Sequence, residues 1–241
     1  MDVVIHGTNT YAANEFMLIV EKEKNIQGMA FDLSMTRDKK IVIFTPTPNS
    51  IVTKESLQDS TFEQLKTYRI YTLEDALHYF DGYKNKIILN VMPLNHPPMT
   101  EDTLAGITNL NKEYIEEICR VVENHPNLNI YLTSISRTLV SYMKEKIKKN
   151  KLGFSIGYDN SYIDVDFYVF SPGFLNAEIM KQQIDNGKEI MLSVRDCEDI
   201  NLLYRFFFGI ERYSIRNEIL NALTFISDYP IILLTVLERN T

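Results

Sequence analysis

Residues 29–44 read Met-Ala-Phe-Asp-Leu-Ser-Met-Thr-Arg-Asp-Lys-Lys-Ile-Val-Ile-Phe. Two apolar runs, 29–33 and 41–44, are joined here by a polar turn at 37–40. This connection is too short for the helical crossover that parallel strands require, so the two runs are predicted to pair as an antiparallel hairpin. The outer arm of such a hairpin does not count as a strand of a parallel barrel.

Further short apolar runs recur on both sides of this hairpin. They are apolar on both faces, which suits buried parallel strands. These runs are 3–5, 87–91, 128–132, 154–156, 167–170, 190–194 and 224–226. Together with 29–33 they give eight predicted strands, which is the number that a closed βα barrel needs.

Amphipathic segments, with charged residues opposite an apolar face, alternate with most of these strands. The predicted helices cover residues 13–24, 72–79, 112–124, 137–149, 176–186, 198–207 and 214–223. The alternation predicts a single α/β domain over residues 1–241, an eight-stranded βα (TIM) barrel with a small β-hairpin after the second strand. The predicted helix at 214–223 makes the connection between the last two predicted strands, 190–194 and 224–226, longer than is usual in such a barrel. The aromatic run 206–208 before it indicates barrel packing, with an interaction surface as the alternative.

The composition excludes several classes of protein. The 241 residues are 45% hydrophobic and 24% charged, with nine Gly and eight Pro, so collagen-like and broadly disordered chains are excluded. The formal net charge is −7 and the basic residues are mostly scattered, so no nucleic-acid partner is expected. Cys119 and Cys197 form no CxxC motif, and reduced thiols predict a cytoplasmic protein.

The chain shows no targeting or nucleotide-binding signal. Its first residues read as a strand and not as a signal peptide. The longest apolar runs, such as 231–234, are far shorter than the ~20 residues of a membrane span, so none is expected. Gly7 is the only glycine before Gly28, so no glycine-rich phosphate loop follows the first strand.

Seven stretches have a recognisable order and spacing. They are His6-Gly7-Thr8, Ala30-Phe31-Asp32 with the hairpin to Thr45, Tyr71-Thr72-Leu73-Glu74-Asp75, Leu89-Asn90-Val91-Met92-Pro93-Leu94, Leu132-Thr133-Ser134-Ile135, Gly187-Lys188 through Ser193-Val194-Arg195-Asp196-Cys197-Glu198-Asp199, and Ile226-Ser227-Asp228-Tyr229-Pro230. Over nearly the whole chain they resemble the motifs of the glycerophosphodiester phosphodiesterase family. The resemblance implies a βα barrel with its site at the C-terminal ends of the strands.

The resemblance also implies which chemistry the family performs. Its active members hold calcium or magnesium with carboxylates and use two histidines as acid and base on a phosphodiester, in glycerophospholipid metabolism. A hard cation needs several oxygen ligands, and the charge of the phosphate must be neutralised as the bond to the leaving alcohol breaks. In this chain, His6 stands at the position of the first histidine and Asp32 at the position of a metal-binding aspartate.

The other six polar positions of the family are replaced in this chain. The replacements are Gly7 for arginine, Ala30 for glutamate, Phe44 for histidine, Thr45 for aspartate, Met92 for glutamate and Leu94 for lysine. Apolar side chains neither ligate a hard metal nor move a proton. We therefore expect that the metal-dependent mechanism is lost and that no cofactor is required.

Four residues remain as candidates for a site. His6 is either a remnant catalytic group or a strand-end histidine bonded to its neighbours, and its missing partners favour the second reading. Asp32 either binds a cation or belongs to a polar layer under the site. Ser193 and Arg195 are candidate substrate-binding residues, with a surface salt bridge as the commoner role of such an arginine.

Other polar residues carry weaker signals. Ser134, Ser136 and Ser171 fall near strand ends without a histidine nearby in the sequence to activate them. His78, His96 and His125 show no ligand spacing, and solvent exposure is expected for them.

Three functions follow as hypotheses. The first is an inactive barrel of this family, a pseudoenzyme that binds a small phosphodiester or another small ligand at its mouth, or that regulates a partner. The second is a phosphoric diester hydrolase with a rebuilt site around His6 and Asp32. The third is a structural role in an oligomer or complex, although the sequence identifies neither a protein partner nor an oligomeric state.

Overall fold

Eight parallel strands form the centre of the computed structural model, which describes residues 2–7, 25–44, 52–68, 70–94, 107–156, 162–208 and 214–238. They are β1 (Asp2–His6), β2 (Ile26–Met35), β5 (Lys86–Val91), β6 (Asn129–Ser134), β7 (Lys151–Ile156), β8 (Phe167–Phe170), β9 (Glu189–Val194) and β10 (Leu223–Ser227). Each strand pairs with the next in this order, and β10 pairs with β1 to close the barrel. The predicted βα barrel is therefore confirmed.

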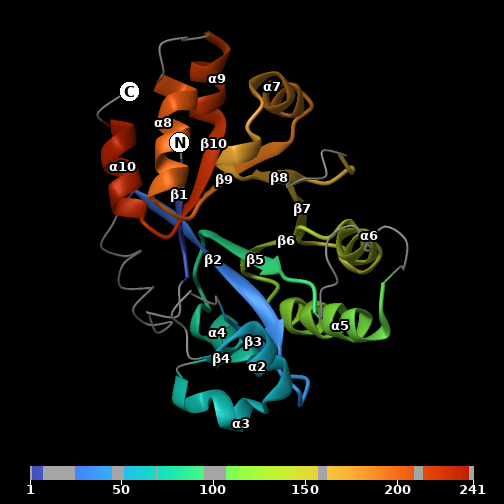
Figure 1. Cartoon of the computed structure of the whole chain (residues 1–241). Coiled ribbons are helices and arrows are strands. Elements are labelled where there is room, and N and C mark those ends of the chain that lie inside the picture. Colours follow the sequence, from blue (N-terminus) through green and yellow to red (C-terminus); the bar gives the residue numbers. More distant parts are fainter. Residues whose placement is uncertain are drawn as a thin grey trace.

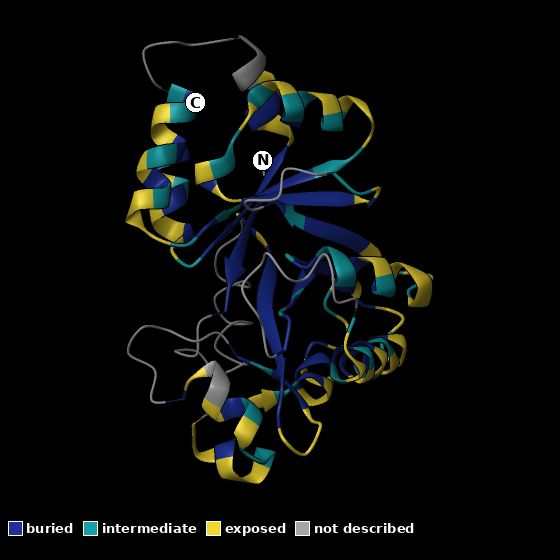
Figure 2. Ribbon diagram, turned by 45° about the vertical axis from the view of Figure 1, so that its right-hand side comes forward, coloured by how far each residue is buried: buried dark blue, intermediate teal, exposed yellow. Residues whose placement is uncertain are grey.

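Helices surround these strands (Figure 1). They are α4 (Leu73–Tyr79), α5 (Asn109–Glu123), α6 (Arg137–Lys146), α7 (Ala177–Asp185), α8 (Cys197–Phe208), α9 (Ser214–Ala222) and α10 (Pro230–Glu238). Figure 2 shows the strands buried and the outer faces of the helices exposed. Six predicted helices are confirmed, and the seventh, at 13–24, lies outside the described residues.

The predicted hairpin is also present. β3 (Ile41–Ile43) pairs antiparallel with β2, with Leu33 opposite Ile43. The structure adds elements that the sequence did not predict, namely β4 (Tyr71–Thr72), α2 (Lys54–Asp59), α3 (Phe62–Leu65) and the 3₁₀ turn η1 (Lys66–Tyr68). Buried side chains of α2, α3 and β3 and of residues near these elements or next to β4 form a separate apolar cluster, made of Val42, Phe44, Val52, Leu57, Leu65 and Ile70.

A layer of apolar side chains fills the inside of the barrel. Its members are Val4, Ala30, Ile88, Tyr131, Phe167, Val169, Met191 and Ile226. β7 contributes Gly153, where a Cβ atom would lie 2.3 Å from the ring of Phe167. Glycine therefore makes room for this ring, and the filled layer forms a floor beneath the C-terminal ends of the strands.

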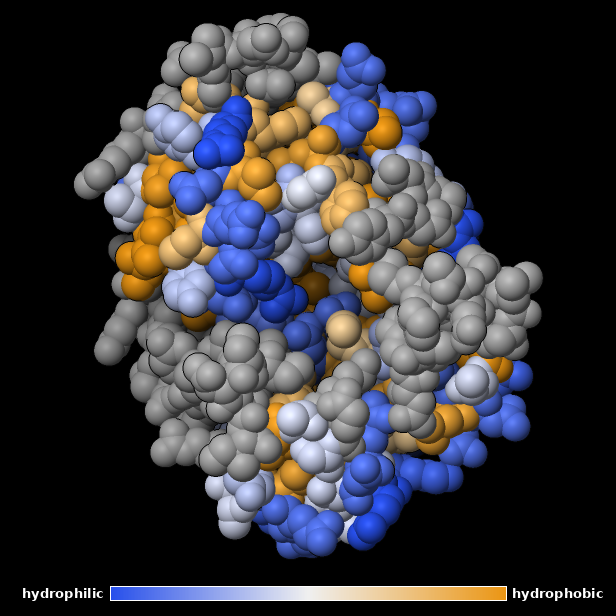
Figure 3. Space-filling model, in the orientation of Figure 1, coloured by the Kyte–Doolittle hydropathy of each residue, from blue (hydrophilic) through white to orange (hydrophobic). Residues whose placement is uncertain are grey.

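The outer surface near α8, α9 and α10 carries apolar side chains. Phe207 is buried, and Phe206 and Phe208 pack partly buried against the main core, as the packing interpretation expects. Ile231 and Ile232 of α10 are 57% and 50% exposed. Figure 3 shows an apolar area at its left, on the side where Figure 1 shows α10. No helix in the described part of the chain is long and apolar enough to span a membrane.

Candidate functional site

A ring of eight polar residues lies above the apolar layer, one on or just after each barrel strand. Its members are His6, Asp32, Asn90, Thr133, Ser155, Ser171, Ser193 and Asp228, which we call the polar ring. Each follows an interior position by two residues, as Asp32 follows Ala30, and side chains two apart on a strand share a face. The sheet register aligns Asp32 with Asn90, and Asn90 with Thr133.

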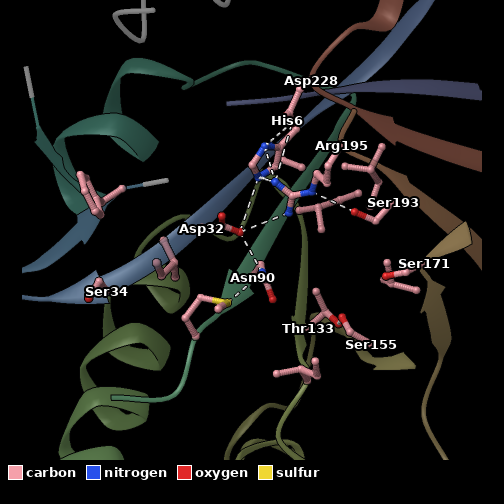
Figure 4. A pocket seen from close by; sticks show the side chains of 18 of the residues that line it. His6, Asp32, Ser34, Asn90, Thr133, Ser155, Ser171, Ser193, Arg195 and Asp228 are labelled. Carbon is pink, nitrogen blue, oxygen red and sulfur yellow. Dashed lines mark hydrogen bonds and ion pairs between the residues drawn. The ribbon is translucent and has the colours of Figure 1, made fainter. Parts of the chain in front are cut away.

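All eight members of the polar ring line a cavity of about 740 Å³ (Figure 4). A cavity of this size lies within the range of small-molecule sites. Its other lining residues include Ala30, Ser34, Phe44, Met92, Arg195 and Tyr229. The cavity therefore lies at the C-terminal end of the barrel, where sites of this fold occur.

His6 is held between two carboxylates. Its Nδ1 atom lies 2.7 Å from Oδ1 of Asp228, and its Nε2 atom lies 3.5 Å from Oδ1 of Asp32. The His6 side chain is almost fully buried, and both carboxylates are largely buried. The strands β1, β2 and β10 are neighbours in the barrel, which brings these three distant positions of the sequence together.

Arg195 completes what we call the charged cluster, made of His6, Asp32, Arg195 and Asp228. Its Nη1 atom lies 2.7 Å from each ring nitrogen of His6 and 3.7 Å from Oδ1 of Asp228. Its Nη2 atom lies 3.6 Å from Oδ1 of Asp32. Nε donates a hydrogen bond of 2.9 Å to Ser193 Oγ, which fixes the guanidinium plane. The expectation of a surface salt bridge is therefore wrong, because the partners of Arg195 are buried in the mouth.

The charged cluster shifts the pKa of His6 and of Asp32. Burial lowers the pKa of His6, but the carboxylates of Asp32 and Asp228 outweigh it, so the pKa is raised overall. Burial raises the pKa of Asp32, but His6, Arg195 and the amide of Asn90 outweigh it, so this pKa is lowered. Asp32 is therefore ionised at neutral pH, and its charge is balanced within the protein.

The remaining five members of the polar ring carry no charge. Asn90, Thr133, Ser155, Ser171 and Ser193 come from or directly follow the five consecutive strands β5 to β9, and we call them the neutral arc. Asn90 Nδ2 donates a hydrogen bond of 2.8 Å to Asp32, and Thr133 Oγ1 lies 3.2 Å from Ser155 Oγ. The cavity thus has one charged side and one uncharged polar side (Figure 4).

The residues of the mouth do not fit a calcium or magnesium ion. Asp32 is already paired with Arg195, and the positions where the resemblance implies further ligands and a base hold Ala30, Met92 and Phe44, which line the cavity. Among the described residues, no three His, Cys, Asp or Glu side chains converge so as to hold a metal. A hard cation requires several oxygen ligands, and this donor set offers too few.

The structure thus brings His6, Asp32, Ser193 and Arg195 into one cavity. Asp228 belongs to the same cluster and was missed in the sequence, although its motif at 226–230 was noticed. Its signal was the repeated pattern of an interior apolar residue followed two positions later by a polar one.

The polar residues with weaker signals in the sequence have different roles in the structure. Ser134 Oγ donates to a backbone carbonyl of β5, and Ser136 caps α6, so both are structural. His78 is exposed, as expected. Thr45 and His96 lie outside the described residues.

No protein-family model matches the chain, and no curated protein matches it. Among solved structures, it is similar to a glycerophosphodiester phosphodiesterase from Agrobacterium tumefaciens (TM-score 0.66, 10% identity, 98% of this chain and 99% of that one). A phosphodiesterase from Oleispira antarctica, solved with its product sn-glycerol-3-phosphate, gives a TM-score of 0.64 at 15% identity (99% and 97%). The Thermotoga maritima glycerophosphodiester phosphodiesterase gives 0.62 at 15% identity (97% of each). The chain therefore has the fold of the glycerophosphodiester phosphodiesterases.

Proposed function

We propose that this protein is a glycerophosphodiester phosphodiesterase-like barrel that binds a small molecule at its mouth, in a binding or regulatory role, and does not hydrolyse phosphodiesters with a metal ion. The observation that carries the proposal is the guanidinium of Arg195 between Asp32 and Asp228. The positive charge of this guanidinium pairs with the carboxylates that a metal ion would need as ligands. The cavity itself remains large enough for a ligand.

The chemistry of the cavity wall supports this proposal. Phosphodiester hydrolysis needs an acid and a base on opposite sides of the phosphorus, together with positive charge for the phosphate oxygens. Phe44 stands where the second histidine would act, and the positive charges of the mouth are already paired with carboxylates.

The test measures both the turnover of phosphodiesters and the binding of small molecules. The purified chain is incubated with glycerophosphocholine and related diesters, with calcium, with magnesium and with EDTA, and release of glycerol 3-phosphate is measured. We expect no metal-dependent release. Ligand-observed NMR with a small-molecule panel that includes glycerophosphocholine is expected to detect binding that Arg195→Gln weakens. Robust turnover that depends on calcium or magnesium would contradict the proposal.

One observation favours a second candidate, a phosphoric diester hydrolase with a rebuilt site. The buried pair of His6 and Asp228, with the raised pKa of His6, suits a general acid that protonates a leaving oxygen. In this case Asp228 would hold the imidazole at Nδ1, and the leaving oxygen would take its proton from Nε2, whose contact with Asp32 is the longer one at 3.5 Å. Metal-independent turnover that is lost in His6→Ala but kept in His78→Ala would favour this candidate over the first.

A further inference from the structure

Resting on the proposed function, we infer that the ligand of the mouth is a small uncharged polyhydroxylated molecule, a polyol or sugar, whose hydroxyl groups bind along the neutral arc. The inference is drawn from the distribution of charge and of hydrogen-bonding capacity around the cavity.

The charge of the cavity disfavours an anionic ligand. Among the described lining residues, the acidic side chains are Asp32, Asp196 and Asp228, and the basic ones are Arg195 and His6. With His6 protonated the lining carries one net negative charge, and with His6 neutral it carries two. A phosphate or phosphodiester would meet net repulsion here, whereas an uncharged molecule would not.

The neutral arc offers hydrogen bonds of the kind that hydroxyl groups need. Each serine or threonine hydroxyl both donates and accepts. Ser193 Oγ accepts from Arg195, which leaves its own proton free to donate. The Asn90 amide donates through Nδ2 to Asp32 and to Met92 Sδ, and in Figure 4 its carbonyl oxygen lies toward Thr133 and Ser155. Five consecutive strands thus present an uninterrupted row of amphoteric or accepting groups.

Ser34 supplies an independent observation on the opposite wall. It lies on β2, two residues beyond Asp32, and lines the same cavity. The residue is 3% exposed, and its Oγ atom has no hydrogen-bond partner among the described residues. A buried hydroxyl without a partner is costly, and a ligand hydroxyl in the cavity would satisfy it.

The apolar part of the lining suits the carbon skeleton of such a ligand. Ile88, Val169 and Ile226 form the floor, Phe44 lies on the wall, and Tyr229, a residue that is 46% exposed, also lines the cavity. The C–H faces of a sugar or cyclic polyol pack on apolar and aromatic surfaces of this kind while its hydroxyls turn to polar groups.

The test uses ligand-observed NMR titration of the full chain with myo-inositol, D-glucose and glycerol, and separately with glycerol 3-phosphate and inorganic phosphate. We expect at least one uncharged probe to bind more tightly than either phosphate. Ser171→Ala and Ser155→Ala are each expected to weaken its binding about three- to tenfold, the effect of one lost hydrogen bond.

Matched controls separate recognition from folding. Ser141→Ala removes an exposed hydroxyl on α6 away from the cavity and is expected to leave binding unchanged. Ser171 is exposed, so its variant is expected to fold even if Ser155→Ala does not, and a melting curve for each variant checks this.

The outcomes distinguish this inference from the proposed function. Binding of a phosphate probe without binding of any uncharged probe would overturn the inference and leave the small-molecule function standing. Binding of an uncharged probe that neither serine variant weakens would also overturn it. If no probe of either class bound, both the inference and the proposed function would fail.

Discussion

Arg195 meets both carboxylates of the charged cluster with different nitrogens of one guanidinium. Nη2 faces Asp32 and Nη1 faces Asp228, while His6 lies between the two acids. A planar guanidinium can serve two carboxylates at once, which a lysine ammonium does less well. The side chain of Arg195 is 35% exposed, so water screens part of this attraction and its contribution to stability is smaller than that of a fully buried pair.

His6 predicts a pH dependence of stability. Its unfolded-state pKa is near 6.5 and its folded-state pKa is higher, because Asp32 and Asp228 outweigh burial and the opposing charge of Arg195. The contribution of protonated His6 is therefore fully present below pH 6.5 and is lost as the pH rises through the folded-state value. In that window the free energy of unfolding falls by up to about 1.4 kcal/mol per pH unit.

The measurement is urea unfolding at a series of pH values for the wild type and for His6→Gln. Glutamine keeps a polar group but cannot take up the proton. The difference in unfolding free energy between the two proteins is expected to shrink as the pH rises above 6.5. Parallel profiles over this range would show that His6 does not titrate as its contacts predict.

Three of the four members of the charged cluster could be named as candidates from the sequence, but their contacts with one another could not be predicted from it. His6, Asp32 and Arg195 were candidates because of their places in motifs. That Arg195 contacts a residue 189 positions earlier follows only from closure of the barrel, which places β9 and β10 beside β1. The guanidinium could equally have turned to solvent, and only the packed structure decides between the two directions.

At the scale of elements, β7 shows how the floor of the cavity is built. Gly153 lies two residues before Ser155 of the polar ring, at the position where the other strands carry an apolar side chain. The ring of Phe167 from β8 occupies the space that a side chain on β7 would take. β7 therefore carries no side chain at this position, and the ring of Phe167 on β8 fills the space inside the barrel.

This arrangement predicts that Gly153→Ala destabilises the protein. Its Cβ atom would lie 2.3 Å from the Phe167 ring, so the ring or a strand must shift. Overpacking of this kind costs about 1–3 kcal/mol. Urea unfolding measures the loss, with Gly173→Ala as the control because, apart from its two chain neighbours, no heavy atom of the described residues lies within 4 Å of its added Cβ. Equal stability of the two variants would show that the floor is not tightly packed.

The elements differ in how well the sequence predicts them. The barrel strands form short runs that are apolar on both faces, and long helices such as α5 have a clear amphipathic period, so both kinds of element were predicted with small errors at their ends. α10 was missed because it is apolar on nearly all sides and has no polar face to reveal a helical period. α2 and α3 have six and four residues, which are too few for a period to be seen.

At the scale of the whole molecule, the closed barrel brings eight strand ends to one mouth. The polar ring is the product of that closure, since each strand supplies one member and no short segment of sequence contains more than one or two. The charged cluster occupies the side formed by β9, β10, β1 and β2, and the neutral arc extends over β5 to β9. A fold shared with glycerophosphodiester phosphodiesterases thus carries a mouth whose charged groups pair with one another, and its function has to be argued from this site and not from the fold.

The most direct test of this account is a calorimetric titration of calcium into the purified protein. The account holds that Arg195 already balances the carboxylates of the mouth, so no saturable calcium binding is expected at millimolar concentrations. Stoichiometric calcium binding to the wild type that disappears in Asp32→Asn would contradict it.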